Sequence, residues 1–298
     1  MISVFDLNRR EPLSNLRTIP SRKHTSSTQT MKGIISALDI DPHSGILAAG
    51  TFTRCVGLYD HEGSGNVVSI FSLAEQGDNT SSSLKGVTDI KWSHCGTYLY
   101  VSERKDTKIT VWDVRKLYAK VGTLTGRDAF TVQRLGIDIS LGDGDREVVV
   151  GGGTNGKINL WDPHATTSPV ATWEAHGGAL CSTNCLCEEN RGLTLLLDPI
   201  TSVAVNPAWS GLIASCSGQR NYSRDNAEEQ SEPHRIDNSL RLWRYSRYYY
   251  GEVPVDSETH SIGHDLATST VSAIETDPYS HIEDNNTEGT GGVVPEGE

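Results

Sequence analysis

The chain has 298 residues, of which 36% are hydrophobic, 21% charged and 7% aromatic, with 29 glycines. These proportions are typical of a globular protein rich in turns. No stretch approaches the roughly 20 apolar residues of a membrane helix, and the N-terminus lacks the apolar core of a secretory signal, so we expect neither class. Six cysteines in a chain of this length form no disulfide scaffold and fit a reducing cytosolic or nuclear compartment.

The net charge of -12 is unevenly distributed along the chain. Residues 1–32 hold six Lys and Arg against two Asp and Glu, whereas residues 247–298 hold one Arg against eleven Asp and Glu. The net charge is therefore +4 for the first segment, -10 for the last segment and -6 for the residues between them. An acidic total therefore does not exclude a nucleic-acid partner.

A short pattern of alternating apolar residues, an aromatic and usually Asp recurs along the chain. Period-two alternation predicts a strand with one buried face at each occurrence. The aromatics are 54, 53, 49 and 82 residues apart, and the five occurrences are Ile2–Asp6, Val56–Asp60, Ile109–Asp113, Ile158–Asp162 and Leu240–Arg244.

Two further apolar runs precede four of these strands, and a fourth strand follows three of them. The first runs are Ser36–Ile40, Thr88–Trp92, Arg134–Ile139 and Thr201–Val205; the second are Ile46–Gly50, Tyr98–Ser102, Val148–Gly152 and Leu212–Ser215. The fourth are Val67–Leu73, Val121–Leu124 and Val170–Trp173. Four strands ending in Trp-Asp are the unit of a WD-repeat propeller. We therefore predict an all-β, WD40-type β-propeller of about four blades plus two strands of a fifth.

The predicted propeller spans residues 1–246, with insertions at 177–197 and 221–237. The acidic tail, 247–298, has low hydrophobicity and no repeat, and we expect it to be disordered. The repeated aromatics should pack between blades, and the Asp residues should satisfy turn backbone groups. These structural repeat positions are Phe5, Tyr59, Trp112, Asp113, Trp161, Asp162 and Trp243.

Two segments resemble ligand sites without meeting their requirements. Gly151–Lys157 matches most of a phosphate-binding loop, but Ile158 replaces the required Ser or Thr and opens a strand, so we interpret it as a turn. His176 lies near Cys181, Cys185 and Cys187, whose spacing lacks the second ligand pair of a zinc site. We expect no metal, no nucleotide and no other cofactor, and we find no catalytic constellation, which favours a non-enzymatic protein.

Several motifs in their order resemble the telomerase Cajal body protein family of WD-repeat proteins. The most specific are Arg104-Lys105-Asp106 before Trp112-Asp113, and Ser217-Gly218-Gln219-Arg220 before an acidic insertion; Gln133-Arg134 enters the blade between them. The resemblance runs from residue 1 to about residue 245. It implies a seven-bladed propeller, so that roughly three blades would precede Ile2 and this chain begins inside a blade.

The resemblance also implies a function and a location. Family members bind a short loop element in Cajal-body guide RNAs and telomerase RNA and direct these RNAs to Cajal bodies in the nucleus. Relatives in simple eukaryotes are tied to pre-mRNA splicing. We therefore expect nuclear localisation, with a cytoplasmic pool left open, and small nuclear or guide RNA with its ribonucleoprotein partners, besides other proteins bound at the propeller rim.

Candidate RNA-binding residues lie at predicted strand ends and turns. Proteins that read unpaired RNA grip phosphates with Arg and Lys and stack bases on aromatic rings or guanidinium planes, while amides contact base edges. The candidates are Arg104, Lys105, Gln133, Arg134, Gln219, Arg220 and, more weakly, Arg54. Two alternatives stay open: a protein-only scaffold of the G-protein β-like type, and an enzyme using the Gly151–Lys157 loop.

Overall fold

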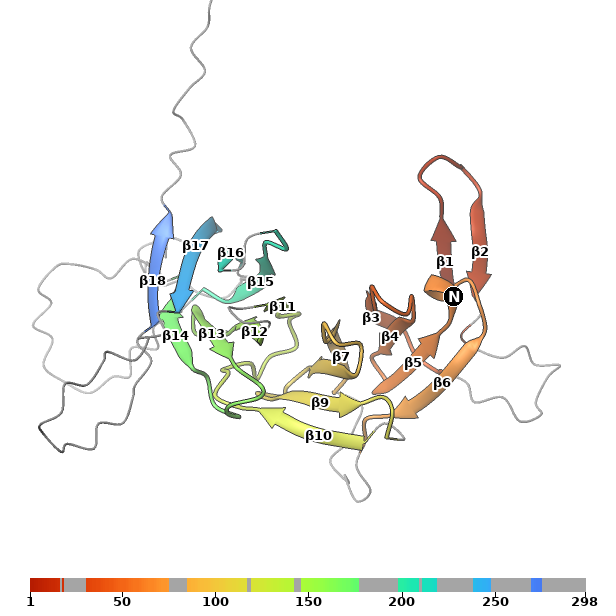
Figure 1. The fold of residues 1–298 in the computed structure, drawn as a ribbon, viewed down its shortest axis with the longest axis horizontal. Helices are drawn as coiled ribbons and strands as arrows, with labels where there is room; N and C mark the ends of the chain where they lie inside the picture. The colour runs from red at the N-terminus through yellow and green to blue at the C-terminus, as the bar shows by residue number, and fades with distance from the viewer. Residues whose placement is uncertain are drawn as a thin grey trace, which may run out of the picture.

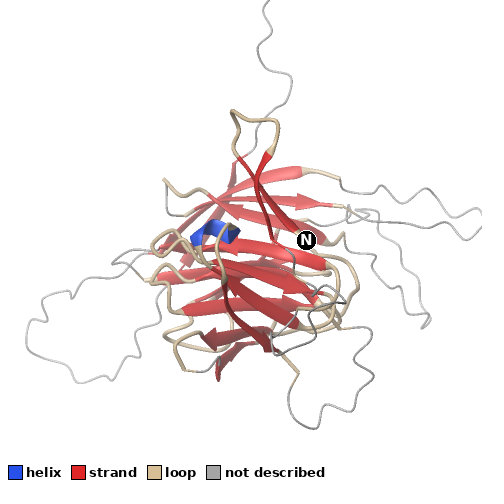
Figure 2. Ribbon diagram, turned by 90° about the vertical axis from the view of Figure 1, so that its right-hand side faces the viewer, coloured by secondary structure: helices blue, strands red, loops and turns tan. Residues whose placement is uncertain are grey.

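The computed structural model describes residues 1–16, 18, 31–74, 85–116, 119–141, 146–176, 198–208, 211–218, 238–247 and 269–274. Within them the secondary structure is almost entirely strand, and the exception is one short helical turn, His61–Gly63 (Figure 2). No helix in this part of the chain has the length and apolarity of a bilayer-spanning segment.

The strands form one two-stranded and four four-stranded antiparallel sheets, each meandering outward in chain order. The N-terminal hairpin is β1 (Ile2–Phe5) and β2 (Pro12–Leu16). Blade 1 is β3 (Ile35–Ile40), β4 (Leu47–Thr51), β5 (Cys55–Tyr59) and β6 (Val67–Ser72); blade 2 is β7 (Val87–Trp92), β8 (Tyr98–Glu103), β9 (Ile109–Asp113) and β10 (Ala119–Leu124). Blade 3 is β11 (Ile137–Leu141), β12 (Glu147–Gly152), β13 (Lys157–Trp161) and β14 (Ala171–Glu174); blade 4 is β15 (Ile200–Val205), β16 (Leu212–Ser217), β17 (Leu240–Arg247) and β18 (Ser269–Ile274).

These sheets follow one another around an open arc, with the first strand of each blade on the concave side (Figure 1). The prediction of four propeller blades plus two strands of a fifth is therefore confirmed. Two details differ from the sequence prediction. Strand β11 begins at Ile137, which leaves Arg134 in the preceding loop, and β18 lies inside the segment that we expected to be disordered.

The core consists of apolar clusters between successive blades. Tyr59, Trp112, Trp161 and Trp243, the aromatics of the third strands, are all buried, and each belongs to a different cluster. Phe5 holds the same repeat position in β1 but is 59% exposed, in contrast to the expectation. The reason is that β1 belongs to the first described sheet, so no described blade precedes it.

Carboxylates on the inner strands join neighbouring blades. Asp39 of β3 accepts a hydrogen bond from the Trp92 backbone N–H at 2.6 Å, and Asp138 of β11 accepts one from Val205 at 2.7 Å. Lys91 of β7, between them, forms a 3.0 Å ion pair with Asp138. Each link ties one first strand to the next, which fixes the spacing of the blades along the concave side.

Candidate nucleic-acid interface

In a meandering blade, the turn between the second and third strands lies at the same end as the segment entering the first strand. We call this end of the blades the turn face. Backbone hydrogen bonds join its parts: the Arg104 N–H donates to Gly86, at 2.8 Å, and the Lys105 N–H donates to Thr131, at 2.8 Å. The turn face therefore unites the turn after β8 with the segments that enter blades 2 and 3.

Arg104 stacks on an aromatic ring at the turn face. Its guanidinium carbon lies 3.6 Å from the centroid of Phe52, which belongs to the turn after β4. This cation–π geometry fixes the guanidinium plane in front of the ring. The buried Nε atom of Arg104 has no hydrogen-bond partner among the described residues. The next residue, Lys105, has a left-handed backbone with φ of 51°, as a tight turn requires.

Gln133 and Arg134 lie in the loop of residues 125–136, between β10 and β11. The Gln133 N–H donates to the Thr131 hydroxyl at 3.1 Å, and its side chain is half-buried. Arg134 forms a 3.2 Å ion pair with Asp89 of β7, yet its side chain remains 63% exposed. It also lines a concave-side pocket of about 420 Å³ together with Lys91 and Ile137. Gln133 and Arg134 thus lie in the same loop as the Thr131 carbonyl that accepts from Lys105.

The buried side chain of Arg127 anchors this loop. Its guanidinium donates to the Gly152 carbonyl at 2.7 Å, the Leu135 carbonyl at 2.9 Å and the Ser102 hydroxyl at 2.9 Å. Burial lowers the pKa of Arg127 to about 10. Because these bonds reach strands of blades 2 and 3 as well as the loop itself, the loop is fixed to the propeller body.

Arg54, the weaker RNA-binding candidate, is buried rather than presented to solvent. Its Nε atom lies 2.6 Å from the Glu103 carboxylate, and Nη2 donates to the Leu73 carbonyl at 3.3 Å. Burial raises the pKa of Glu103 above its usual value, and the neighbouring Arg54 opposes that shift. This buried ion pair joins blades 1 and 2, so we do not include Arg54 in the proposed contact surface.

Gln219 and Arg220 lie outside the described residues, as do the insertions 177–197 and 221–237 with Cys181, Cys185 and Cys187. His176 is described, and its ring lies 2.8 Å from the Ser215 hydroxyl, which also accepts a hydrogen bond from the Trp243 indole. His176 therefore belongs to the packing between blades 3 and 4. The described residues contain no group of three or more His, Cys, Asp or Glu that could hold a metal ion.

The Gly151–Lys157 segment forms the end of β12, a tight turn and the first residue of β13. The Gly153 N–H donates to the Lys157 carbonyl at 2.9 Å, and Gly156 has a φ of 67°, which favours glycine. No helix follows this loop, so it lacks the N-terminal amides that bind a phosphate.

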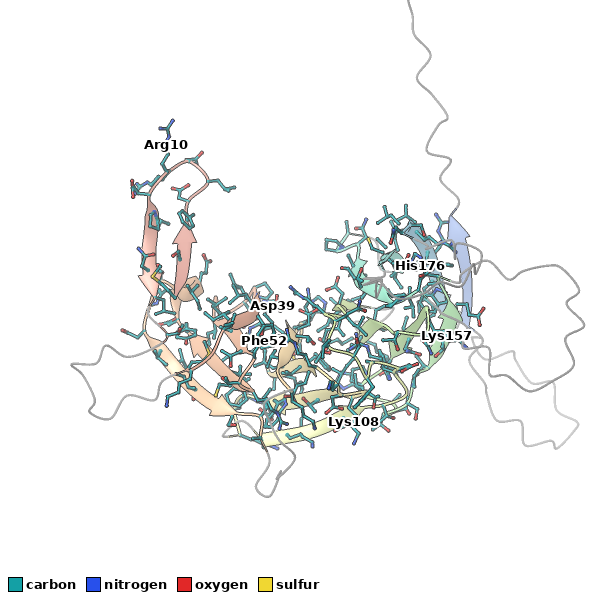
Figure 3. All side chains as sticks on the ribbon, turned by 180° about the vertical axis from the view of Figure 1, so that it is seen from behind. Arg10, Asp39, Phe52, Lys108, Lys157 and His176 are labelled. Atoms are coloured by element: carbon teal, nitrogen blue, oxygen red, sulfur yellow. The ribbon has the colours of Figure 1, made fainter. Side chains whose placement is uncertain are left out.

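The structure also brings residues to the turn face that repeat analysis did not select. Phe52 supports Arg104, and Phe130 and Val132 project from the loop of residues 125–136. The available sequence signal was an aromatic residue in a connection between two strands. By contrast, the basic Arg10 lies at the tip of the N-terminal hairpin, away from Phe52 (Figure 3).

Curated proteins similar to this chain include a Schizosaccharomyces pombe protein named guanine nucleotide-binding protein negative regulator 1, which is 29% identical over 72% of this chain and 48% of its own length. Proteins named telomerase Cajal body protein 1 are also similar. The rat protein is 25% identical over 78% of this chain and 37% of its own length, and the bovine protein 27% over 82% and 39%. The chain thus spans less than half the length of these relatives.

No family model matches the sequence. Among solved structures, a chain in the crystal structure of the mitotic checkpoint complex is 20% identical, with a TM-score of 0.45 over 71% of this chain and 50% of that chain. The assignment of the fold depends on the four blades and their repeated aromatics. The chain therefore has the fold of a WD40-type β-propeller and is similar in sequence to proteins named telomerase Cajal body protein 1.

Proposed function

We propose that this chain is a non-enzymatic, RNA-binding WD-repeat protein that acts in the localisation or biogenesis of small nuclear ribonucleoproteins. The observation that carries the proposal is the junction between the Arg104–Lys105 turn and the loop of residues 125–136. It brings together Arg104 and Lys105, for which the described residues supply no ion pair, and Gln133 and Arg134 of the adjoining loop, where the Arg134 guanidinium pairs with Asp89 yet stays 63% exposed. This combination can contact phosphates, base faces and base edges.

The names of the relatives support the same role. Proteins named for the telomerase and the Cajal body are similar over 78% and 82% of this chain. By this analogy, the RNA would be of the telomerase or Cajal-body guide type, bound together with ribonucleoprotein partners in the nucleus. A link to pre-mRNA splicing belongs to the same small nuclear ribonucleoprotein setting. The proposal requires no metal or nucleotide cofactor.

Crosslinking followed by sequencing of the bound RNA tests the proposal directly. We expect small nuclear or guide RNAs to be enriched above background. The matched variant is Arg104→Ala combined with Arg220→Ala, which should weaken RNA binding without lowering the thermal midpoint. Lys116→Ala, an exposed cation after β9 at the opposite end of the blades, is the control and should bind normally. Recovery of no such RNA from the unmodified protein would overturn the proposal.

A second candidate function is a protein scaffold without RNA. It is favoured by the similarity to the Schizosaccharomyces pombe protein, whose name describes a negative regulator of a guanine nucleotide-binding protein. In that case co-purification would yield a G-protein subunit, and nuclease treatment would leave the complex intact. The RNA-binding proposal expects nuclease treatment to release the partners.

A further inference from the structure

The loop of residues 125–136 presents apolar side chains to solvent at its tip. Phe130 is 69% exposed and Val132 is 54% exposed, while Ala129 beside them is buried. Phe130 therefore contributes little to the apolar core that holds the blades together. Phe130 and Val132 expose apolar area close together in one loop, and exposed apolar groups that cluster mark interaction sites more often than scattered single ones do.

The backbone beneath this tip is held on both sides. The Thr131 N–H donates to the Ala129 carbonyl at 2.7 Å, and the Thr131 carbonyl accepts from Lys105. Thr154 donates to the Asp128 carbonyl at 2.7 Å, and Arg127 anchors the loop to blades 2 and 3. Phe130 is thus carried by a preorganised loop, so that binding through its ring loses little conformational entropy.

The chemistry around Phe130 favours a nucleobase over an apolar peptide. The Lys105 N–H donates to the carbonyl of Thr131, the residue after Phe130. Arg104, the residue before Lys105, has its guanidinium stacked on Phe52. The nearby acidic residues are Asp128, which is exposed, and Asp106, which lies 3.8 Å from Lys85. The guanidinium stacked on Phe52 belongs to the residue before Lys105, and the Lys105 N–H is bonded to Thr131, the residue after the exposed ring of Phe130, so the two flat groups lie in adjoining segments of the turn face. Unpaired bases stack on such surfaces while their phosphates meet the cations.

We propose that Phe130 and the Arg104–Phe52 pair form a stacking platform for unpaired bases of RNA. This inference depends on the proposed function and makes it more specific, because it predicts recognition of single-stranded rather than duplex RNA. In A-form duplexes the base faces are covered by their neighbours, so the ring of Phe130 has no face to stack on.

The test is the affinity of the full chain for a short, unpaired, mixed-sequence RNA oligonucleotide and for the same strand annealed to its complement. Phe130→Ala should weaken binding of the unpaired strand by about 5- to 160-fold, as expected for the loss of one stack between a base and an aromatic ring. It should leave binding of the duplex unchanged. Phe130→Tyr keeps the ring and should bind the unpaired strand within about two-fold of the original chain. The thermal midpoint of each variant confirms that it is folded.

Three outcomes separate this inference from the proposed function. If Phe130→Ala and Arg104→Ala bind the unpaired strand normally while Lys105→Ala binds it weakly, the platform is refuted and RNA binding stands. If the unmodified chain binds neither the oligonucleotide nor cellular RNA, both proposals fail. If Phe130→Ala loses a co-purifying protein but no RNA affinity, the tip is a protein contact and the platform is refuted.

Discussion

Buried and half-buried arginines serve different roles in this protein. Arg127 satisfies three backbone carbonyls and a hydroxyl, and Arg54 neutralises the buried Glu103 carboxylate. Arg104 stacks on Phe52, and its buried Nε has no hydrogen-bond partner among the described residues. Removing Arg54 or Arg127 leaves buried polar groups without partners, which is destabilising. Of the three, Arg104 is therefore the one best suited to contact a ligand.

Asp39 is a half-buried carboxylate whose effect on stability depends on pH. Burial raises the pKa of its carboxyl above the usual 3.8, and the Trp92 N–H and Lys91 oppose the shift only in part, with Asp89 adding to it. A raised pKa means that folding disfavours the ionised form. The penalty is absent below the pKa of the unfolded chain and reaches its full size above the pKa of the folded chain.

We therefore predict that Asp39→Asn raises the thermal midpoint at pH 7 and that this gain disappears as the pH falls below about 3.8. Asparagine keeps the shape of the side chain and an oxygen that can accept from Trp92. Asp138→Asn is the control, since it removes the 3.0 Å ion pair with Lys91 and should lower the midpoint at pH 7. Thermal unfolding across this pH range measures both. A midpoint for Asp39→Asn below that of the unmodified chain at pH 7 would contradict the prediction.

The first strands of the blades carry an equivalent apolar position that faces the preceding blade. Leu38, Ile90, Ile137 and Val203 occupy it, each paired in register with the corresponding residue of the second strand. Ile90 and Ile137 are fully buried and Val203 nearly so, whereas Leu38 is 51% exposed. Blade 1 is preceded in the described chain by the two-stranded N-terminal hairpin, which does not cover the inner strand.

This difference predicts unequal effects of the same kind of truncation. Ile90→Ala should lower the free energy of unfolding by about 2–5 kcal/mol, because it leaves a cavity between blades 1 and 2. Leu38→Ala should change it by no more than about 0.5 kcal/mol, as at a surface position. Denaturant titration of both variants measures the two values. Equal losses would show that Leu38 is covered in solution.

At the scale of the whole molecule, the arc separates two surfaces. The concave side carries Asp39, Asp89, Asp138 and Lys91, and most of these charges pair with one another or with the backbone of the next blade. The turn face carries Arg104 and Lys105, for which the described residues supply no ion pair. Arg104 and Lys105 therefore offer positive charge to an anionic partner at this end of the blades, although the chain as a whole has a net charge of -12.

This arrangement predicts that RNA affinity falls steeply with salt. If Arg104, Lys105 and Arg134 each neutralise one phosphate, the logarithm of the affinity should fall with the logarithm of the salt concentration with a slope of about -2, at ~0.7 per phosphate for single strands. Arg134→Ala should reduce this slope by about 0.7. Titrations at several salt concentrations measure the slope. A slope near zero would favour the protein-scaffold alternative.

The repeat pattern by itself predicted the class of fold, the four blades and the strands of the N-terminal hairpin, because period-two alternation and turn residues act locally. It did not predict β18, whose short apolar alternation, Val271 and Ala273, is separated from the preceding strand by a long connection. It also placed the start of β11 at Arg134, because it could not recognise that Arg127 anchors the residues before Ile137 as a loop.

For the candidate site, the sequence determined which cations stand at turns, and the tertiary structure decided which of them are available. Arg54 and Arg104 occupy corresponding turns of neighbouring blades with similar local sequence signals. The Arg54 side chain forms an ion pair with the buried Glu103 carboxylate, whereas the Arg104 guanidinium stacks on an aromatic ring. Phe130 joins the same face because Lys105 and Thr131 share a hydrogen bond across two blades. Such contacts depend on the packing of residues far apart in the chain, and local periodicity carries no information about them.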